Sequence, residues 1–309
     1  MNNYNNPKKS LLLLELDDKL NFLIKLYNQK NLPKVLMLTG NKGIGKFTLI
    51  NHFLNYVFDK KNYNLEKNSI NNQAVFYKQF LNNAFSSIIC LDGAFHKNIK
   101  IDDIRQLKST ILKSSLLNKE RFIVLDDIEL FNINSLNALL KILEEPSEKN
   151  YFILINNKTK SLMDTIYSRC IEIKINISNG KRINIINALL ETYSIKSLID
   201  YKKFNISPGM FLLFNEICQK HTIDLNDNFL DNLENILVIY KKTKDLNLIN
   251  MILFLTEYHF FNLQENDSVN LEKIIENKAF VISNINKFVS YNLNQTSLLN
   301  SINMKLSNG

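Results

Sequence analysis

The sequence has 309 residues, of which 45% are hydrophobic and 22% are charged. These values are typical of a globular protein and exclude a disordered chain. A chain of this length exceeds one average domain, so we expect two or three domains. The formal net charge of +8 permits an acidic partner such as nucleic acid. Because only four basic residues are arginine, at positions 105, 121, 169 and 182, most of the positive charge is expected to be solvated surface lysine.

Cysteine and histidine usage argues against disulfides and metal centres. The three cysteines, Cys90, Cys170 and Cys218, stand far apart without a CxxC pair, so neither a disulfide framework nor a zinc site is predicted. The four histidines show no HxxxH spacing. We therefore expect a reducing, cytoplasmic location. The apolar run Leu11–Leu14 ends at Glu15, too early for a signal peptide, and no apolar stretch has the length of a membrane span.

The first predicted elements form a strand-loop-helix unit. Apolar spacing predicts a helix over Leu20–Tyr27, a buried strand over Val35–Thr39 and a second helix from Lys46 to about Val57. Three of the seven glycines lie between the strand and that helix, within Gly40–Gly45. The Asn- and Lys-rich segment Asn62–Asn72 follows, and we expect it to be an exposed loop.

Three further apolar runs, Ser87–Leu91, Phe122–Leu125 and Tyr151–Ile155, have the length of buried parallel strands, and helical patterns separate them. This alternation predicts an α/β three-layer fold with a parallel sheet. No strand is predicted after Ile175, where Ser178-Asn179-Gly180 is a turn signal.

The C-terminal part is predicted to be all helical. Apolar residues there recur at helical spacing, as in Leu230, Leu233 and Leu237, and a polar break falls at Thr222–Asp227. We predict three domains: an α/β domain over residues 1–173, a small helical domain over 174–222 and a helical domain over 223–309.

The glycine-rich segment has the GxxxxGK pattern of a phosphate-binding loop. Gly40, Gly43 and Gly45 allow backbone N–H groups to face phosphate oxygens, and Lys46 would reach the terminal phosphates of a nucleotide. The next residue normally carries a hydroxyl that ligates magnesium, but here it is Phe47. Thr48 follows one position later, about 100° further around the helix, where its hydroxyl would face elsewhere or touch a phosphate.

Paired carboxylates end the predicted strand Phe122–Leu125. Asp126 could hold magnesium or its waters, and Asp127 could polarise an attacking water. The second acid of such a pair is normally glutamate, and aspartate is one methylene shorter. The alternative is that both acids cap the following helix.

Beyond these acids the sequence resembles the clamp-loader branch of the AAA+ family. Residues 136–146 have the sequence LNALLKILEEP, which resembles the NALLKxLEEP stretch of that family. Phe152–Asn157 and Ser168-Arg169-Cys170 resemble its sensor 1 strand and SRC motif, in the same order and at similar spacing. The resemblance covers about residues 20–175 and implies a AAA+ P-loop module, a small helical lid domain and a helical collar domain.

The resemblance assigns roles residue by residue. Lys46 would be the phosphate lysine, Asp126 and Asp127 the Walker B acids, and Asn157 the sensor 1 polar group. Arg169 would be an arginine finger, which acts in trans on the nucleotide of a neighbouring subunit. Cys170 is expected to be a small packed residue rather than a nucleophile.

Three departures indicate a degenerate nucleotide site: Phe47, Asp127 and the residues after Ser207-Pro208-Gly209, where active members carry a sensor 2 arginine but Met210 follows here. The four-cysteine zinc module of many bacterial relatives is also missing, because only Cys90 lies in that interval. The pattern resembles a delta-prime-like stator, a subunit of DNA polymerase III that keeps the finger and hydrolyses ATP weakly or not at all.

The resemblance implies gamma/tau-like motor subunits and a delta-like wrench subunit as partners, with the sliding clamp and primer-template DNA contacted through the assembly. No membrane partner is expected. ATP and Mg²⁺ are candidate cofactors that the departures argue against. Two other interpretations stay open: an active ATPase motor in which Thr48 and water replace the lost hydroxyl, and a DNA-binding adaptor that acts outside a loader.

Overall fold

The protein is described by a computed structural model over residues 6–94, 99–113, 120–225, 227–266 and 270–307. It divides into two compact units: Met1–Ile195 with Ser207–Phe211, and Lys196–Ile206 with Leu212–Gly309. The division into domains over residues 1–173, 174–222 and 223–309 stays a prediction.

The first unit is built on a five-stranded parallel sheet with the order β4-β5-β6-β1-β7. Its strands are β1 (Val35–Thr39), β4 (Ile88–Asp92), β5 (Arg121–Asp126), β6 (Asn150–Asn156) and β7 (Ile171–Lys174). Thr39 pairs with Asn156, and Asp92 pairs with Asp126. The carboxyl ends of these strands therefore bring polar residues to one edge of the sheet.

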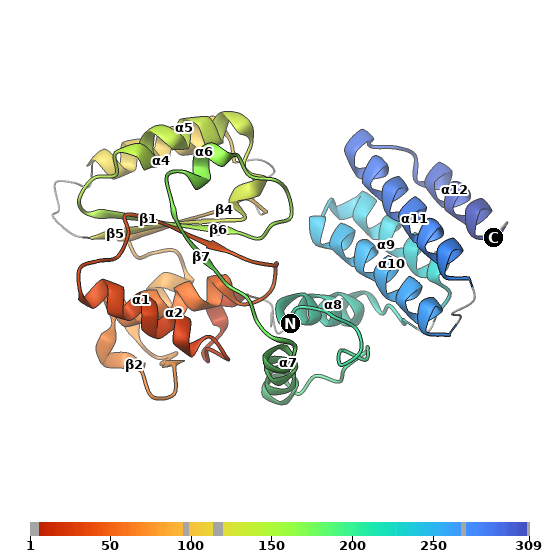
Figure 1. Ribbon diagram of the computed structural model, residues 1–309, viewed down its shortest axis with the longest axis horizontal. Coiled ribbons are helices and arrows are strands. Elements are labelled where there is room, and N and C mark those ends of the chain that lie inside the picture. Colours follow the sequence, from red (N-terminus) through yellow and green to blue (C-terminus); the bar gives the residue numbers. More distant parts are fainter. Residues whose placement is uncertain (1–5, 95–98, 114–119, 226, 267–269, 308–309) are drawn as a thin grey trace. The chain divides into compact units, whose positions relative to one another are not determined.

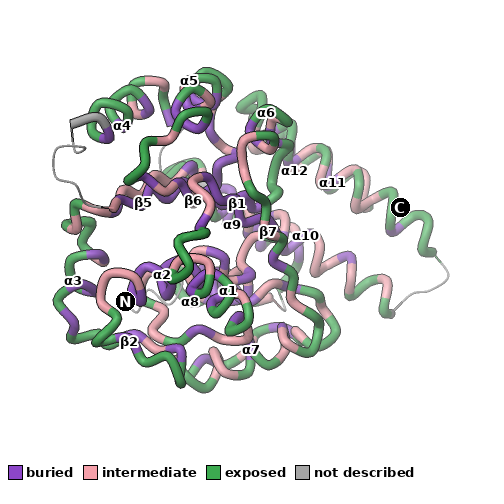
Figure 2. The backbone as a smooth tube through the Cα atoms, turned by 60° about the vertical axis from the view of Figure 1, so that its left-hand side comes forward, coloured by how far each residue is buried: buried purple, intermediate pink, exposed green. Residues whose placement is uncertain are grey.

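The inner strands form because both of their faces are buried, and Figure 2 shows buried residues along β5, β6 and β1. Alternate residues enter different cores: Phe122 and Val124 pack on one side of the sheet, whereas Ile123 and Leu125 pack on the other. Each of these four side chains is fully buried. This double burial explains the continuous apolar runs in the sequence.

Helices cover both faces of the sheet (Figure 1). The layer on one face contains α1 (Asp17–Asn28), α2 (Lys46–Phe58) and α3 (Val75–Leu81), and the opposite layer contains α4 (Ile101–Lys113), α5 (Ile133–Glu144) and α6 (Asp164–Tyr167). The predicted α/β three-layer fold followed by helices is thus confirmed.

The segment Asn62–Asn72 corrects one prediction. It forms a short antiparallel hairpin, β2 (Tyr63–Asn64) and β3 (Ser69–Ile70), instead of an exposed loop. Tyr63 and Ile70 are buried, and the Tyr63 hydroxyl lies 3.0 Å from Nδ1 of the buried His52. Burial of Tyr63 and Ile70 therefore determines the structure of this segment despite its polar composition.

Two further differences concern β7 and the start of α7 (Asn179–Tyr193). The strand β7 was not predicted, because it is a largely exposed edge strand without an apolar run. Ser178 does not form a turn: its side chain accepts a hydrogen bond from the backbone N–H of Lys181 and so caps α7.

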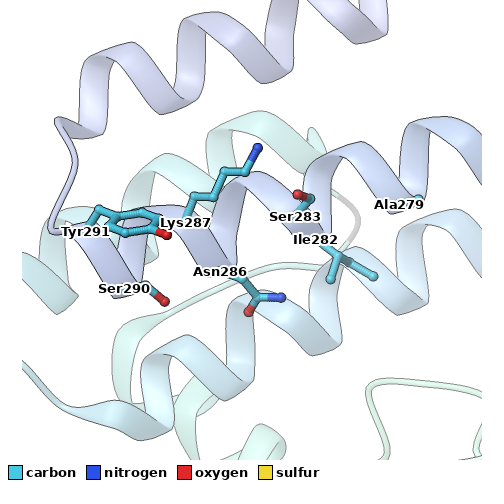
Figure 3. Close-up of a pocket in the computed structure, with 7 residues that line it drawn as sticks. All are labelled: Ala279, Ile282, Ser283, Asn286, Lys287, Ser290 and Tyr291. Carbon is cyan, nitrogen blue, oxygen red and sulfur yellow. The ribbon is translucent and has the colours of Figure 1, made fainter.

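The second unit is helical. It contains most of α8 (Pro208–His221), with α9 (Phe229–Thr243), α10 (Leu246–Asn266), α11 (Leu271–Tyr291) and α12 (Gln295–Ser307). Figure 3 shows a surface pocket of this unit whose labelled residues all come from α11, including Ser283, Asn286 and Tyr291. No helix in the described part of the chain is long and apolar enough to cross a membrane.

Candidate functional site

The glycine-rich loop joins β1 to α2 in the form expected of a phosphate-binding loop. Gly43 has a φ of +82° and Gly45 a φ of +93°, in the left-handed region that favours glycine. Gly45 precedes α2 directly, and no side chain caps that helix. The first backbone N–H groups of α2 are thus placed as in an anion-binding helix terminus.

Lys46 is buried and folds back onto its own loop. Its Nζ donates hydrogen bonds of 2.7 Å to the carbonyl oxygens of Gly40 and Asn41. Burial lowers the pKa of Lys46 to about 8, although the charges of Asp126, Glu129 and Asp127 oppose this shift. The lysine is therefore held at the position from which it could meet a phosphate.

The two predicted acids lie side by side at the end of β5. Burial, followed by the charges of Asp127 and Asp92, raises the pKa of Asp126 to about 7. Asp127 is buried, with a φ of +48°. Its Oδ2 lies 3.0 Å from Nζ of Lys42 in the phosphate loop, so the acid that would polarise water is already paired with a cation.

Asn157 lies with these acids, as the resemblance implies. Its Nδ2 donates to Oδ1 of Asp127 at 2.7 Å and to Oδ1 of Asp126 at 3.4 Å. The buried carboxylate of Glu129 accepts from the backbone N–H of Asn157 and, at 2.8 Å, from the hydroxyl of Thr159. Glu129 thereby fixes the loop that carries Asn157.

The side chains present fit a bound magnesium ion poorly. Magnesium prefers oxygen ligands in octahedral geometry. Phe47 offers no oxygen and packs against the core beneath α2, and Asp127 is committed to Lys42. No group of three potential metal-ligating residues was found among the described residues. Asp126 as a magnesium ligand and Thr48 as a phosphate contact stay predictions.

The beginning of α8 packs directly on the phosphate loop. The Ser207 hydroxyl donates to the carbonyl oxygen of Lys42 at 2.7 Å, and the backbone N–H of Gly209 donates to the carbonyl oxygen of Gly43 at 2.7 Å. Met210 follows, at the place where the family resemblance implied a sensor 2 arginine. The next residues are buried, beginning with Phe211.

Arg169 contacts a different set of groups. It follows α6, and its guanidinium forms an ion pair with Glu144 at the end of α5. Its Nη1 also donates to the carbonyl oxygen of Thr165 at 2.9 Å. The side chain is 27% exposed. Cys170 is half-buried, its pKa is raised by burial to about 12, and its thiol donates to the carbonyl oxygen of Ile166.

Sequence reasoning placed Lys46, Asp126, Asp127 and Asn157 in one site, and these residues do lie together. It missed Lys42, Glu129 and Glu144. Lys42 sits at a variable position of the loop pattern, and nothing in the sequence indicates its pairing. The signal for Glu129 was its place two residues after Asp127, close enough to the strand end to reach the same site.

Comparison with known proteins decides the family. The family model described as "DNA polymerase III, delta subunit" matches residues 16–179, which is more than half of the chain. The chain belongs to this family. The match covers the phosphate loop, the paired acids and the segment containing Arg169, so the predicted membership of the AAA+ clamp-loader family is confirmed.

Individual relatives of this DNA polymerase III family agree. The chain is 26% identical over 211 residues to the DNA polymerase III subunit gamma of Buchnera aphidicola subsp. Acyrthosiphon pisum, covering 65% of this chain and 54% of that protein. It is 27% identical over 173 residues to the DNA polymerase III subunit delta' of Buchnera aphidicola subsp. Baizongia pistaciae, covering 54% of this chain and 49% of that protein. The chain thus spans about half the length of these relatives.

Among solved structures, a DNA polymerase III gamma subunit-related protein from Thermotoga maritima aligns with a TM-score of 0.46 at 18% identity. The alignment covers 91% of this chain and 96% of that one.

Proposed function

We propose that the chain is a delta-prime-like stator of the replicative clamp loader, which supplies Arg169 to the ATP site of a neighbouring subunit. The observation that carries this proposal is the placement of Arg169. Its guanidinium is partly exposed and contacts α5 and α6, whereas Lys46, Asp127 and Asn157 contact one another or the phosphate loop. An arginine presented at the surface suits a group that stabilises charge on another subunit's γ phosphate.

The chain's own nucleotide site is proposed to hydrolyse ATP weakly or not at all. Three observations support this. Phe47 packs against the core and offers no oxygen, Asp127 forms an ion pair with Lys42, and Met210 stands at the start of α8 in place of an arginine. Each one removes a group that phosphoryl transfer would use.

The proposed assembly gives each part of the chain a role. Residues 1–173 would form the AAA+ module, residues 174–222 the lid and residues 223–309 the collar that joins neighbouring subunits. The partners would be gamma/tau-like motor subunits and a delta-like wrench subunit, and the assembly would load the sliding clamp onto primed DNA. Contact with DNA would be made to backbone phosphates, because the positive charge is carried mainly by lysine.

Reconstitution of the loader with its ATPase partners tests the proposal. Arg169→Ala should abolish hydrolysis at the one partner site that faces this chain, since an arginine finger contributes about 10³-fold or more to turnover. Lys160→Ala removes a positive charge from the β6–α6 connection, which precedes the turn that carries Arg169; Lys160 is exposed, and its loss should leave hydrolysis unchanged. Normal ATP turnover in the Arg169→Ala loader would refute the trans role.

An active ATPase motor is the second candidate function. It is favoured by the buried Lys46 within an intact glycine loop and by the similarity to a gamma subunit. The isolated chain separates the two functions. Magnesium-dependent turnover that Lys46→Ala abolishes would favour the motor, whereas a stator should show no such turnover.

A further inference from the structure

Arg169 is held on three sides by groups of its own chain. Its Nε donates to Oε1 of Glu144 at 3.1 Å, and its Nη2 binds the same oxygen. Its Nη1 donates to the carbonyl oxygen of Thr165 at 2.9 Å and to the Ser168 hydroxyl at 3.3 Å. The side chain therefore has a defined direction before any partner is present.

Glu144 is the last residue of α5. A carboxylate in the last turn of a helix is opposed by the partial negative charge of that terminus. The Arg169 guanidinium offsets this repulsion, and the ion pair joins the end of α5 to the turn after α6. The two helices belong to the same layer (Figure 1) and pack against each other.

We infer that Glu144 is a positioning residue for Arg169: it fixes the direction in which the guanidinium faces the nucleotide of the neighbouring subunit. This inference rests on the proposed trans role of Arg169. An arginine side chain in solvent samples many rotamers, and an arginine finger is effective only when its planar group arrives in one orientation.

The geometry distinguishes positioning from blocking. Glu144 binds Nε and Nη2, and Nη1 donates to Thr165 and Ser168, so these contacts use four of the five N–H donors and leave one on Nη2. The Arg169 side chain remains 27% exposed and that of Glu144 49% exposed, so the pair lies at the surface rather than within a closed core. Contact with a partner's phosphate then needs no change in the fold.

Glu145 provides a matched control, because it is the next residue, it carries the same charge and it is also exposed. Glu144→Gln, Glu145→Gln, Arg169→Ala and the double variant Glu144→Gln/Arg169→Ala would each be assembled into the full loader. ATP hydrolysis would then be measured at the partner site facing this chain, with kcat and KM determined separately.

Glu144→Gln should lower kcat about 10-fold, a loss expected for a displaced catalytic group, and leave the KM for ATP unchanged. Glu145→Gln should change neither constant. Glu144→Asp should recover part of the lost kcat. The double variant should be no slower than Arg169→Ala alone, because a residue that acts only through Arg169 has nothing left to position.

The outcomes separate this inference from the proposed function. Unchanged kcat in Arg169→Ala would refute the trans role itself. A normal kcat in Glu144→Gln together with a slow Arg169→Ala would overturn the positioning role alone. A faster Glu144→Gln would identify Glu144 as a restraint, and additive losses in the double variant would identify it as merely structural; either result overturns the inference.

Discussion

Replacing Gly43 with alanine tests the contact between the phosphate loop and the start of α8. A Cβ atom at this position would lie 2.4 Å from the Ser207 hydroxyl and 2.8 Å from the backbone nitrogen of Met210. The residue also has a φ of +82°, which an L side chain rarely adopts. The substitution therefore strains the loop and forces apart the loop and the first turn of α8, which belongs to the same unit.

The expected cost has two parts. Placing a residue with a Cβ in a left-handed conformation costs about 1–2 kcal/mol. Loss of the hydrogen bond from Ser207 to the carbonyl oxygen of Lys42 adds about 1 kcal/mol. The free energy of unfolding of the first unit should thus fall by about 2–3 kcal/mol, which lowers the Tm of a unit of this size by about 4–12 °C.

Calorimetric unfolding of the isolated chain measures this effect, and Gly180→Ala is the control. Gly180 lies in α7, where an added Cβ meets nothing within 4 Å. Alanine there should stabilise the chain by about 0.5–1 kcal/mol. Equal Tm values for the two variants would contradict the close approach of the loop and α8.

Three further predictions concern buried charge. Lys42→Met should destabilise the first unit by about 1–3 kcal/mol in urea denaturation, because it leaves the Asp127 carboxylate buried without its cation; an unchanged midpoint would show that the ion pair contributes nothing. Asp126→Asn should be more stable than the wild type above pH 7, with the advantage disappearing below about pH 4. Because the pKa of Asp126 is raised to about 7 in the folded protein, the wild type loses stability as pH rises from about 4 to about 7. A difference in stability between the two proteins that does not change with pH would refute the shift. His52 has a pKa lowered by burial to about 4, so wild-type stability should decline as pH falls from 6.5 to 4, and His52→Gln should remove up to roughly 3 kcal/mol of that decline in denaturation at the two pH values.

The sequence predicted the parts of the fold that have a strong local signal. Strands buried on both faces, such as Val35–Thr39, appear as apolar runs, and the observed strand has the predicted bounds. The edge strand Ile171–Lys174 carries no such run, because it is largely exposed. The hairpin within Asn62–Asn72 was missed because its stability comes from burial of Tyr63 and Ile70 in the core beneath the sheet, which no local sequence pattern reports.

In the candidate site, too, the sequence predicted the residues that have a local signal and missed those that depend on tertiary contacts. Lys46, Asp126 and Asn157 occupy fixed places in motifs, so the sequence brought them together. Lys42 and Glu144 have roles that depend on distant partners: Asp127 lies 85 positions from Lys42, and Arg169 lies 25 positions from Glu144. Pairings of this kind are set by tertiary structure, and no spacing in the sequence encodes them.

The contact of Ser207 with Lys42 also constrains how the molecule is made. It joins residues 165 positions apart in the chain. A hydrogen bond of such long sequence separation closes a large loop and must wait until the segments between have folded. During synthesis the phosphate loop emerges early, yet the carbonyl groups of Lys42 and Gly43 gain these partners only after the first turn of α8 has left the ribosome. The shape of the loop is therefore completed among the last steps in the folding of the first unit.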